Sequence, residues 1–318
     1  LATNASAHTQ LTHTGELIEH THIFNQCETK EKIDTLNQPP VRLKLNASKY
    51  PKKAQQRGLE GVVLVEFDVD VGGKVINPKV IWSENEVFNP SALKSVSSSI
   101  YKPALENGKP ILSKGLTQKH TFLLEGNENN LNLGKTFNNV LRDVKSGLRT
   151  GKVEKPIKKL DSLLARKNLD EITRASLLYL KASSLYRVEA PNEEIKSLLI
   201  ESKQHYEEKI VQFKGENVSV KSVTSMKLQT FGGILLGQMY FDESNWQKAE
   251  EELSEAILAS RGSGLKSQRF YQAYLQLGMA SYYQQKWCLA SKSWEKAKIL
   301  ANEYQINFPE QLAEPFNY

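Results

Sequence analysis

The sequence predicts a small α+β domain followed by an all-α array of helical hairpins. Between residues 62 and 125, apolar residues alternate in three strand-like runs, and one helical segment separates the second run from the third. From residue 136 to about 305, apolar residues recur at helical spacing, and part of this pattern repeats further along the chain. Because the two patterns belong to different structural classes, we expect two domains with separate cores in the 318 residues.

The first two strands are expected to form an antiparallel hairpin. In residues 62–70, Val63, Val65 and Phe67 fall on one side, which is the period of a half-buried strand. The run Asp70-Val71-Gly72-Gly73-Lys74 then supplies the residues of a tight turn. The second strand runs from about residue 74 to residue 82.

A helix and a third strand complete the predicted α+β domain. Asn89-Pro90 is typical of a helix start, and the apolar stripe of this helix is expected to extend to Ile100. Pro103 ends the helical segment, because the residue before a proline avoids the α region. The third strand covers residues 114–125, so the predicted order is β-β-α-β.

A set of aromatic, proline, glycine and small residues runs through this stretch in a fixed order, namely Tyr50, Pro51, Ala54, Gly58, Gly61, Asp70, Gly73, Val75, Ser83, Phe88, Ala92, Leu93, Tyr101 and Pro103. With these residues, the stretch resembles the C-terminal domain of TonB-family energy transducers over residues 41–126. The resemblance implies the fold just described and a site of action in the periplasm. It also implies a partner, the TonB-box peptide of an outer-membrane TonB-dependent transporter.

In the helical region two units repeat with an offset of 41 residues. The repeated pairs are Gly237/Gly278, Trp246/Trp287, Ala249/Ala290 and Ala256/Ala297. Their spacings resemble the tetratricopeptide repeat, whose usual period is about 34 residues, with the extra residues in a loop around 261–264. The small residues are expected to let antiparallel helices approach closely. Leu236, Leu253, Leu277 and Trp294 would fill the space between these helices.

Two weaker units at residues 137–165 and 175–202 bring the expected number of helical hairpins to four. The predicted organisation is a polar tail and linker at 1–40, the TonB-like domain at 41–126, a linker at 127–135, tetratricopeptide-like repeats at 136–305 and a C-terminal tail at 306–318.

Composition and motifs limit the possible functions. The net charge of +6 comes from lysines scattered among acidic residues, so we expect no nucleic-acid binding. The sequence has no nucleophile elbow, no His-Glu-x-x-His, no Walker loop and no Cys-x-x-Cys, so we expect no enzymatic activity. The histidines and Cys27 of the tail fit no zinc spacing, and we expect neither a metal nor another cofactor.

The chain gives no direct sign of its cellular compartment. No run approaches the about 18 consecutive apolar residues of a membrane helix. Since the chain begins at Leu1, we expect that an upstream segment, either a signal peptide or a membrane anchor, has been removed. Cys27 and Cys288 could pair only if the tail folds back, and two unpaired thiols is the simpler interpretation.

The first predicted binding surface is the third strand, which we place at a sheet edge. An exposed edge lets a partner peptide add as a further strand through backbone hydrogen bonds. The side chains of the strand would set specificity. The alternative is an edge that Lys119 blunts or that another element covers. The residues predicted to bind the peptide are Gln118, Lys119, His120, Thr121 and Phe122.

The second predicted surface is the groove of the repeats, which is more apolar than a solvated face requires. Its occupant could be a partner, the neighbouring domain or the tail from Phe308 to Tyr318. The predicted groove residues are Phe231, Ile234, Gln238, Phe241, Gln272, Leu275, Met279, Tyr282 and Tyr283.

The function that fits these patterns is a periplasmic TonB-type energy transducer or adaptor whose repeats recruit a second envelope protein. If the missing N-terminal segment is a membrane helix, the resemblance also implies an inner-membrane anchor, ExbB/ExbD-like motor partners and uptake of iron complexes or similar cargo. The alternative is a non-energised periplasmic scaffold in which the repeats bind protein partners. In that case the TonB-like domain is structural or binds the cell wall.

Overall fold

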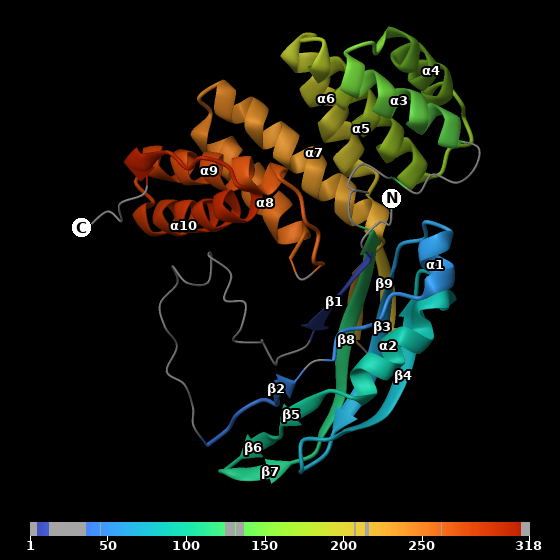
Figure 1. The fold of residues 1–318 in the computed structure, drawn as a ribbon, viewed down its shortest axis with the longest axis vertical. Helices are drawn as coiled ribbons and strands as arrows, with labels where there is room; N and C mark the ends of the chain where they lie inside the picture. The colour runs from blue at the N-terminus through green and yellow to red at the C-terminus, as the bar shows by residue number, and fades with distance from the viewer. Residues whose placement is uncertain are drawn as a thin grey trace. The chain divides into compact units, whose positions relative to one another are not determined.

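The computed structural model describes residues 5–12, 36–44, 46–124, 131, 137–206, 208–213, 216–261 and 263–312. The chain divides into two compact units (Figure 1). The first comprises residues 1–127 together with 261–265, and the second comprises residues 128–260 and 266–318.

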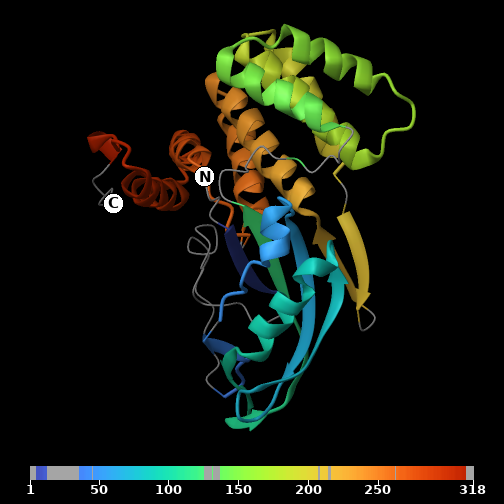
Figure 2. The same cartoon turned by 45° about the vertical axis from the view of Figure 1, so that its right-hand side comes forward.

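The first unit is built on a four-stranded antiparallel sheet in the order β1-β8-β3-β4. The strands are β1 (Ala5–Thr12), β3 (Gly61–Val69), β4 (Val75–Ser83) and β8 (Ser113–Leu124). Helix α2 (Asn89–Ser97) packs on β3 and β4 and lies across one face of the sheet (Figures 1 and 2). The buried apolar residues between them form the core of this unit.

Three aromatic rings from different parts of the first unit meet in its core. Tyr50 lies edge-on to Phe88 and to Phe122, with ring centroids 5.7 and 5.8 Å apart. Phe88 and Phe122 stack on each other at 4.4 Å. Tyr50, Phe88 before α2 and Phe122 in β8 therefore form one aromatic cluster, which contributes to the stability of the core.

The turn between β3 and β4 depends on Asp70 and Gly73. Asp70 Oδ1 accepts hydrogen bonds from the backbone N–H groups of Gly72 and Lys74, at 2.9 and 2.8 Å. Gly73 has a φ of 83°, and a Cβ there would lie 1.9 Å from the carbonyl oxygen of Tyr101. Only glycine therefore fits this turn, which contacts the strand that follows α2.

The helix of the first unit is shorter than predicted. It ends at Ser97, and Ile100 belongs to strand β5 (Ile100–Lys102), which pairs with β2 (Val41–Lys44). Extension of the helical stripe to Ile100 was therefore wrong. The hydroxyls of Ser97, Ser98 and Ser99 donate to carbonyls four residues earlier, a pattern that competes with helix continuation.

Small elements complete this unit. They are α1 (Lys52–Gln56), a 3₁₀ turn at Glu86–Phe88, and the hairpin of β6 (Ala104–Glu106) and β7 (Lys109–Ile111). This hairpin was not predicted, although Asn107-Gly108 is a strong signal for a two-residue turn. Both turn residues have the positive φ that such a turn requires, 50° and 76°.

The second unit is built from consecutive helical pairs and one small hairpin. The helices are α3 (Asn138–Thr150), α4 (Glu154–Leu164), α5 (Glu171–Arg187), α6 (Asn192–Gln204), α7 (Val223–Asp242), α8 (Trp246–Ala259), α9 (Arg269–Tyr283) and α10 (Trp287–Tyr304). Each odd-numbered helix packs on the next one. The hairpin of β9 (Glu208–Phe213) and β10 (Glu216–Lys221) lies between α6 and α7 in sequence, and nothing in the sequence analysis anticipated it.

The repeated glycines lie where paired helices approach most closely. A Cβ at Gly237 in α7 would lie 2.7 Å from Leu253 in α8, and a Cβ at Gly278 in α9 would lie 2.2 Å from Trp294 in α10. Leu253 and Trp294 are themselves buried. The repeat therefore encodes a close helix contact, in which a large side chain of the second helix fills the space that glycine leaves.

Cys288 lies in α10 and is disulfide-bonded. The prediction of an unpaired thiol was therefore wrong for this residue. The chain's other cysteine, Cys27, lies outside the described residues.

We expect Gly278→Ala to destabilise the second unit. The added methyl would displace the Trp294 ring, whose Nε1 donates to the carbonyl of Leu275. Overpacking should outweigh the gain in helix propensity and lower the free energy of unfolding by about 1–2 kcal/mol. Urea unfolding followed by tryptophan fluorescence would measure the change. Gln272→Ala, at an exposed position of the same helix, is the control, and an equal effect of both substitutions would contradict the packing argument.

Candidate functional site

Strand β8 is paired on both sides. On one side it pairs with β3, where Gln118 lies opposite Val65 and His120 opposite Val63. On the other side it pairs with β1, where His120 lies opposite Thr9. The prediction that this strand is the outer strand of its sheet was therefore wrong. Its edge is covered by residues that the sequence analysis assigned to a tail.

Most side chains of the predicted peptide-binding residues are buried. Gln118, His120 and Phe122 are fully buried, Thr121 is buried, and Lys119 is half-buried. Side chains at facing positions of adjacent strands lie beside each other, so those of β8 border any strand that pairs with its outer side. That these side chains set specificity stays a prediction.

A buried polar cluster connects β8 to the segment before α1. Ser48 Oγ lies 2.8 Å from Nδ1 of His120, and Tyr101 Oη donates to Oε1 of Gln118 at 3.2 Å. Burial lowers the pKa of His120 to about 3, and the nearby Arg42 charge acts in the same direction. Burial also raises the pKa of Tyr101 to about 12, against the effect of Arg42. The side chains of His120 and Tyr101 are therefore both uncharged near neutral pH.

Residues 36–44 and 46–50 form a strap that hydrogen bonds hold to later segments of the domain. Gln38 exchanges backbone hydrogen bonds with Leu105, at 3.0 and 2.8 Å. Asn46 Nδ2 donates to the carbonyl of Ser98 at 2.9 Å. Together with the Ser48–His120 contact, these bonds fix the strap along its length.

The opposite outer strand, β4, is poorly suited to strand addition. Its register with β3 shifts between Glu66 and Asp68, where Asn77 takes a φ of 52° and Pro78 provides no N–H group. Lys79 pairs with Glu66 across the strands at 2.7 Å. A bulge, a proline and a charged residue are devices that blunt an edge.

The predicted groove residues of the repeats separate into core and surface. Phe231 and Ile234 are buried, and Phe231 packs against Phe270 under the guanidinium of Arg269. Gln272 and Tyr283 are exposed. The remaining five are half-buried, namely Gln238, Phe241, Leu275, Met279 and Tyr282. The structure therefore does not bring all nine onto one accessible groove.

Five aromatic residues form a continuous cluster, the aromatic ladder, which runs across the α7/α8 and α9/α10 turns. Trp246 stacks on Tyr283 at 4.4 Å, and Tyr283 is 52% exposed. The ladder consists of Phe241, Trp246, Tyr283, Tyr282 and Trp287, in the order of their ring contacts. Our predicted groove omitted both tryptophans, although their 41-residue offset had marked them as equivalent positions.

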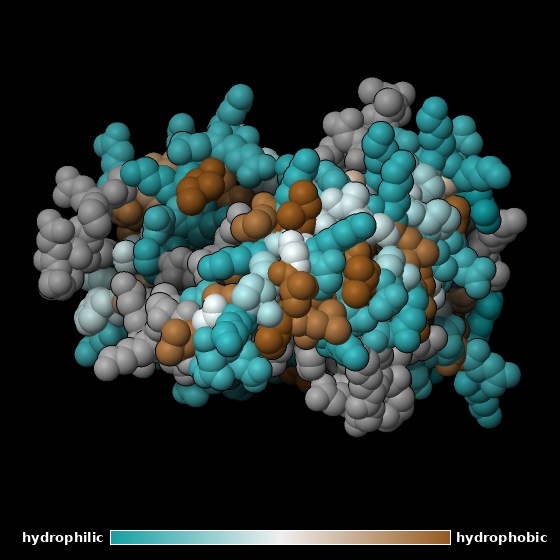
Figure 3. Space-filling model, turned by 90° about the horizontal axis from the view of Figure 1, so that it is seen from below, coloured by the Kyte–Doolittle hydropathy of each residue, from teal (hydrophilic) through white to brown (hydrophobic). Residues whose placement is uncertain are grey.

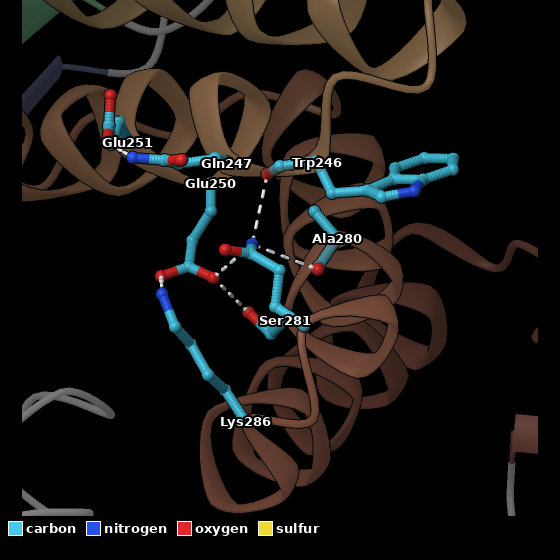
Figure 4. Close-up of polar contacts among 8 residues, drawn as sticks. Trp246, Gln247, Glu250, Glu251, Ala280, Ser281 and Lys286 are labelled. Carbon is cyan, nitrogen blue, oxygen red and sulfur yellow. Dashed lines mark hydrogen bonds and ion pairs between the residues drawn. The ribbon is translucent and has the colours of Figure 1, made fainter.

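A network around Glu250 joins the third and fourth helical pairs beneath the ladder (Figure 4). The carboxylate of Glu250 in α8 accepts from Nζ of Lys286 at 2.5 Å and from Nε2 of Gln284 at 2.7 Å. Gln284 also donates to the carbonyl of Trp246 at 3.1 Å. The side chain of Glu250 is only 12% exposed, although Glu250-Glu251-Glu252 in the sequence is typical of a solvated helix face.

The described parts of the chain contain neither a metal-ligand cluster nor a membrane-spanning helix. Among those residues, no cluster of three or more His, Cys, Asp or Glu side chains could hold a metal ion. No described helix is long and apolar enough to span a membrane. On the face shown in Figure 3, apolar side chains form small patches among hydrophilic ones, as is usual for a water-exposed surface.

The stability of the first unit should depend on pH through His120. The unfolded chain binds a proton as the pH falls below 6.5, whereas the folded chain does so only near pH 3. The free energy of unfolding should therefore fall as the pH decreases between these values, by up to about 1.4 kcal/mol per pH unit. Urea unfolding at about pH 7 and about pH 5, followed by NMR signals of β3, should show a shallower dependence for His120→Gln. Equal slopes would rule out His120 as the responsible group.

We expect Glu250→Gln to weaken the contact between the third and fourth helical pairs. The substitution removes the charge that Lys286 and Gln284 contact and should lower stability by about 1–2 kcal/mol. Glu251→Gln is the matched control, because Glu251 is exposed and accepts a hydrogen bond from Gln247 in the same helix. Tryptophan fluorescence would report both unfolding and the environment of Trp246. A larger effect of the Glu251 substitution would contradict the assignment.

Comparisons with known proteins concern the first unit. Residues 46–124 match the family model described as Gram-negative bacterial TonB protein C-terminal. Two proteins named TonB, from Helicobacter pylori strains J99 and 26695, are each 40% identical over 55 residues, or 17% of this chain. The chain spans only 20% and 19% of the length of these relatives.

A solved structure is also similar in sequence. The solution NMR structure of the Pseudomonas aeruginosa TonB C-terminal domain is 24% identical, with 28% of this chain and 87% of that chain covered and a TM-score of 0.23. The family match supports a TonB C-terminal domain at residues 46–124 of this chain.

Proposed function

We propose that this chain is a periplasmic TonB-type transducer or adaptor that binds a segment of an outer-membrane transporter along β8. The family match at residues 46–124 supports the TonB-type role. The observation that carries the binding mode is the regularity of β8. Its outer side accepts an antiparallel strand over eight consecutive positions, without a register shift.

Two further observations favour β8 over the rest of the sheet. The other outer strand, β4, carries a bulge and Pro78, which interrupt an edge ladder. The inward-facing side chains of Gln118 and His120 hold β8 in place through Tyr101 and Ser48, so its edge is presented on a rigid strand. The guest would gain affinity mainly from backbone hydrogen bonds, as is typical of strand addition.

We further propose that the second unit recruits another envelope protein through the aromatic ladder. Trp287 and Tyr283 are 45% and 52% exposed, and aromatic residues of this kind dominate the binding energy of many protein interfaces. The Glu250 network links the two turns that carry the ladder, because Gln284 and Lys286 of the second turn contact Glu250 of α8. In an anchored precursor, ExbB/ExbD-like motor proteins would supply the energy for uptake of iron complexes or similar cargo.

The alternative is a non-energised scaffold in which the repeats carry the function and the TonB-like domain is structural. The exposed ladder favours it, because partner recruitment by the second unit does not require the β8 edge. Binding of a transporter peptide at β8 distinguishes the two functions.

The test is an NMR titration of the ¹⁵N-labelled full chain with a TonB-box peptide. We expect the largest shift changes at the amides of Ser113–Leu124 and a dissociation constant in the micromolar range, about 1–100 μM. The same peptide with a central proline is the control, and it should bind at least about tenfold more weakly because proline removes a ladder donor. Shift changes confined to the second unit would contradict the proposal and favour the scaffold.

A further inference from the structure

The β8 edge has an occupant within the chain itself. Strand β1 lies antiparallel to β8, from Ala5 opposite Leu124 to Thr12 opposite Thr117. The eight pairs include every position from Gln118 to Phe122, which is the segment proposed to receive a guest. The pairing has no register shift, whereas both ladders of β3 do.

We propose that β1 is an internal guest that closes the β8 edge, so that a partner strand binds only by exchanging with it. The backbone geometry supports this assignment, because β1 fulfils the requirement of strand addition along the whole site. One edge cannot pair with two strands at once. Binding of a partner and pairing of β1 are therefore mutually exclusive.

The composition of β1 suits an exchangeable strand. Its sequence, ASAHTQLT, contains no valine, isoleucine or aromatic residue, whereas β3 contains four valines and a phenylalanine. Residues of the β3 kind stabilise strands through cross-strand packing, and small or polar residues contribute less. Pairing of β1 should therefore depend mainly on its backbone and on its covalent link to the domain.

The covalent link makes β1 an effective competitor despite this composition. Residues 13–40 lie between β1 and β2 in the sequence, so pairing of β1 with β8 is an intramolecular event. Intramolecular tethering can give a strand an effective concentration of up to the order of millimolar. A free peptide of similar intrinsic affinity must exceed that concentration to replace β1. Only a guest with better side-chain packing, or one that is itself held nearby, would displace it at micromolar concentration.

The register also defines the kind of guest that can replace β1. It must be an extended segment without an internal proline, and it must run antiparallel to β8 if it takes over the same ladder. Eight residues suffice to cover the edge from residue 117 to residue 124.

Hydrogen exchange of the full chain tests the internal pairing without any ligand. The variant is Thr9→Pro with Gln10→Pro. Adjacent strand residues point their N–H groups to opposite sides, so the two prolines remove one donor toward β8. The control is Thr9→Ala with Gln10→Ala. We expect amides of Ser113–Leu124 that face β1 to exchange about tenfold faster or more in the proline variant only, with β3 unchanged.

A peptide-binding experiment tests whether a free strand can replace β1 on β8. This second experiment, unlike the first, rests on the proposed function, and it separates the two proposals. The probes are a synthetic peptide of residues 5–12 and a TonB-box peptide. Both should bind the proline variant at least about tenfold more tightly than the unchanged chain or the alanine control.

The outcomes are distinguishable. Faster exchange and binding of the 5–12 peptide, without TonB-box binding to any chain, would support the internal guest and refute the proposed function. Unchanged exchange together with equal affinities would overturn the internal guest, whether or not the TonB box binds. Sedimentation would show whether the unchanged chain is a dimer that the two prolines dissociate. That result would mean that β1 pairs with β8 of a second copy of the chain, and it would also overturn the proposal.

Discussion

Pairing of backbone groups along β8 is the constraint on which the first unit depends. A central strand must satisfy its backbone N–H and C=O groups on two sides. An unpaired side can pair with a strand of another chain. Here β3 satisfies one side and β1 the other. The same requirement explains why β4 carries a bulge and Pro78 at the far edge. One edge of the sheet is blunted, and the other is regular and occupied.

The buried polar cluster sets what β8 can do. Gln118 and His120 use their side chains inside the domain, so the backbone groups of the strand carry the pairing along its outer side. In strand addition, backbone hydrogen bonds give affinity and alternate side chains give specificity. Competition with β1 would add to that selectivity. An internal strand that occupies the edge would raise the threshold for every weak guest.

The second unit follows a different principle, in which small residues set the distance between paired helices. Gly237 and Gly278 permit close approach, and the Glu250 carboxylate links one helical pair to the next. The consequence at the surface is that aromatic residues of successive turns stack into one ladder. Aromatic residues of the α7/α8 and α9/α10 turns thus lie next to one another at the surface.

The sequence by itself determined the order of the main elements, the β3–β4 turn and the resemblance to a TonB C-terminal domain. These features follow from local rules, namely alternation, turn residues such as Gly73, and helix starts such as Asn89-Pro90. Only the tertiary structure decided that residues 5–12 pair with β8, that α2 ends before Ile100 and that Glu250 is largely buried. The pairing of β1, the pairing of Ile100 in β5 and the burial of Glu250 each involve a partner far away in the chain. The polar run ASAHTQLT gives no clear local signal for a strand, and its pairing partner β8 lies far away in the sequence.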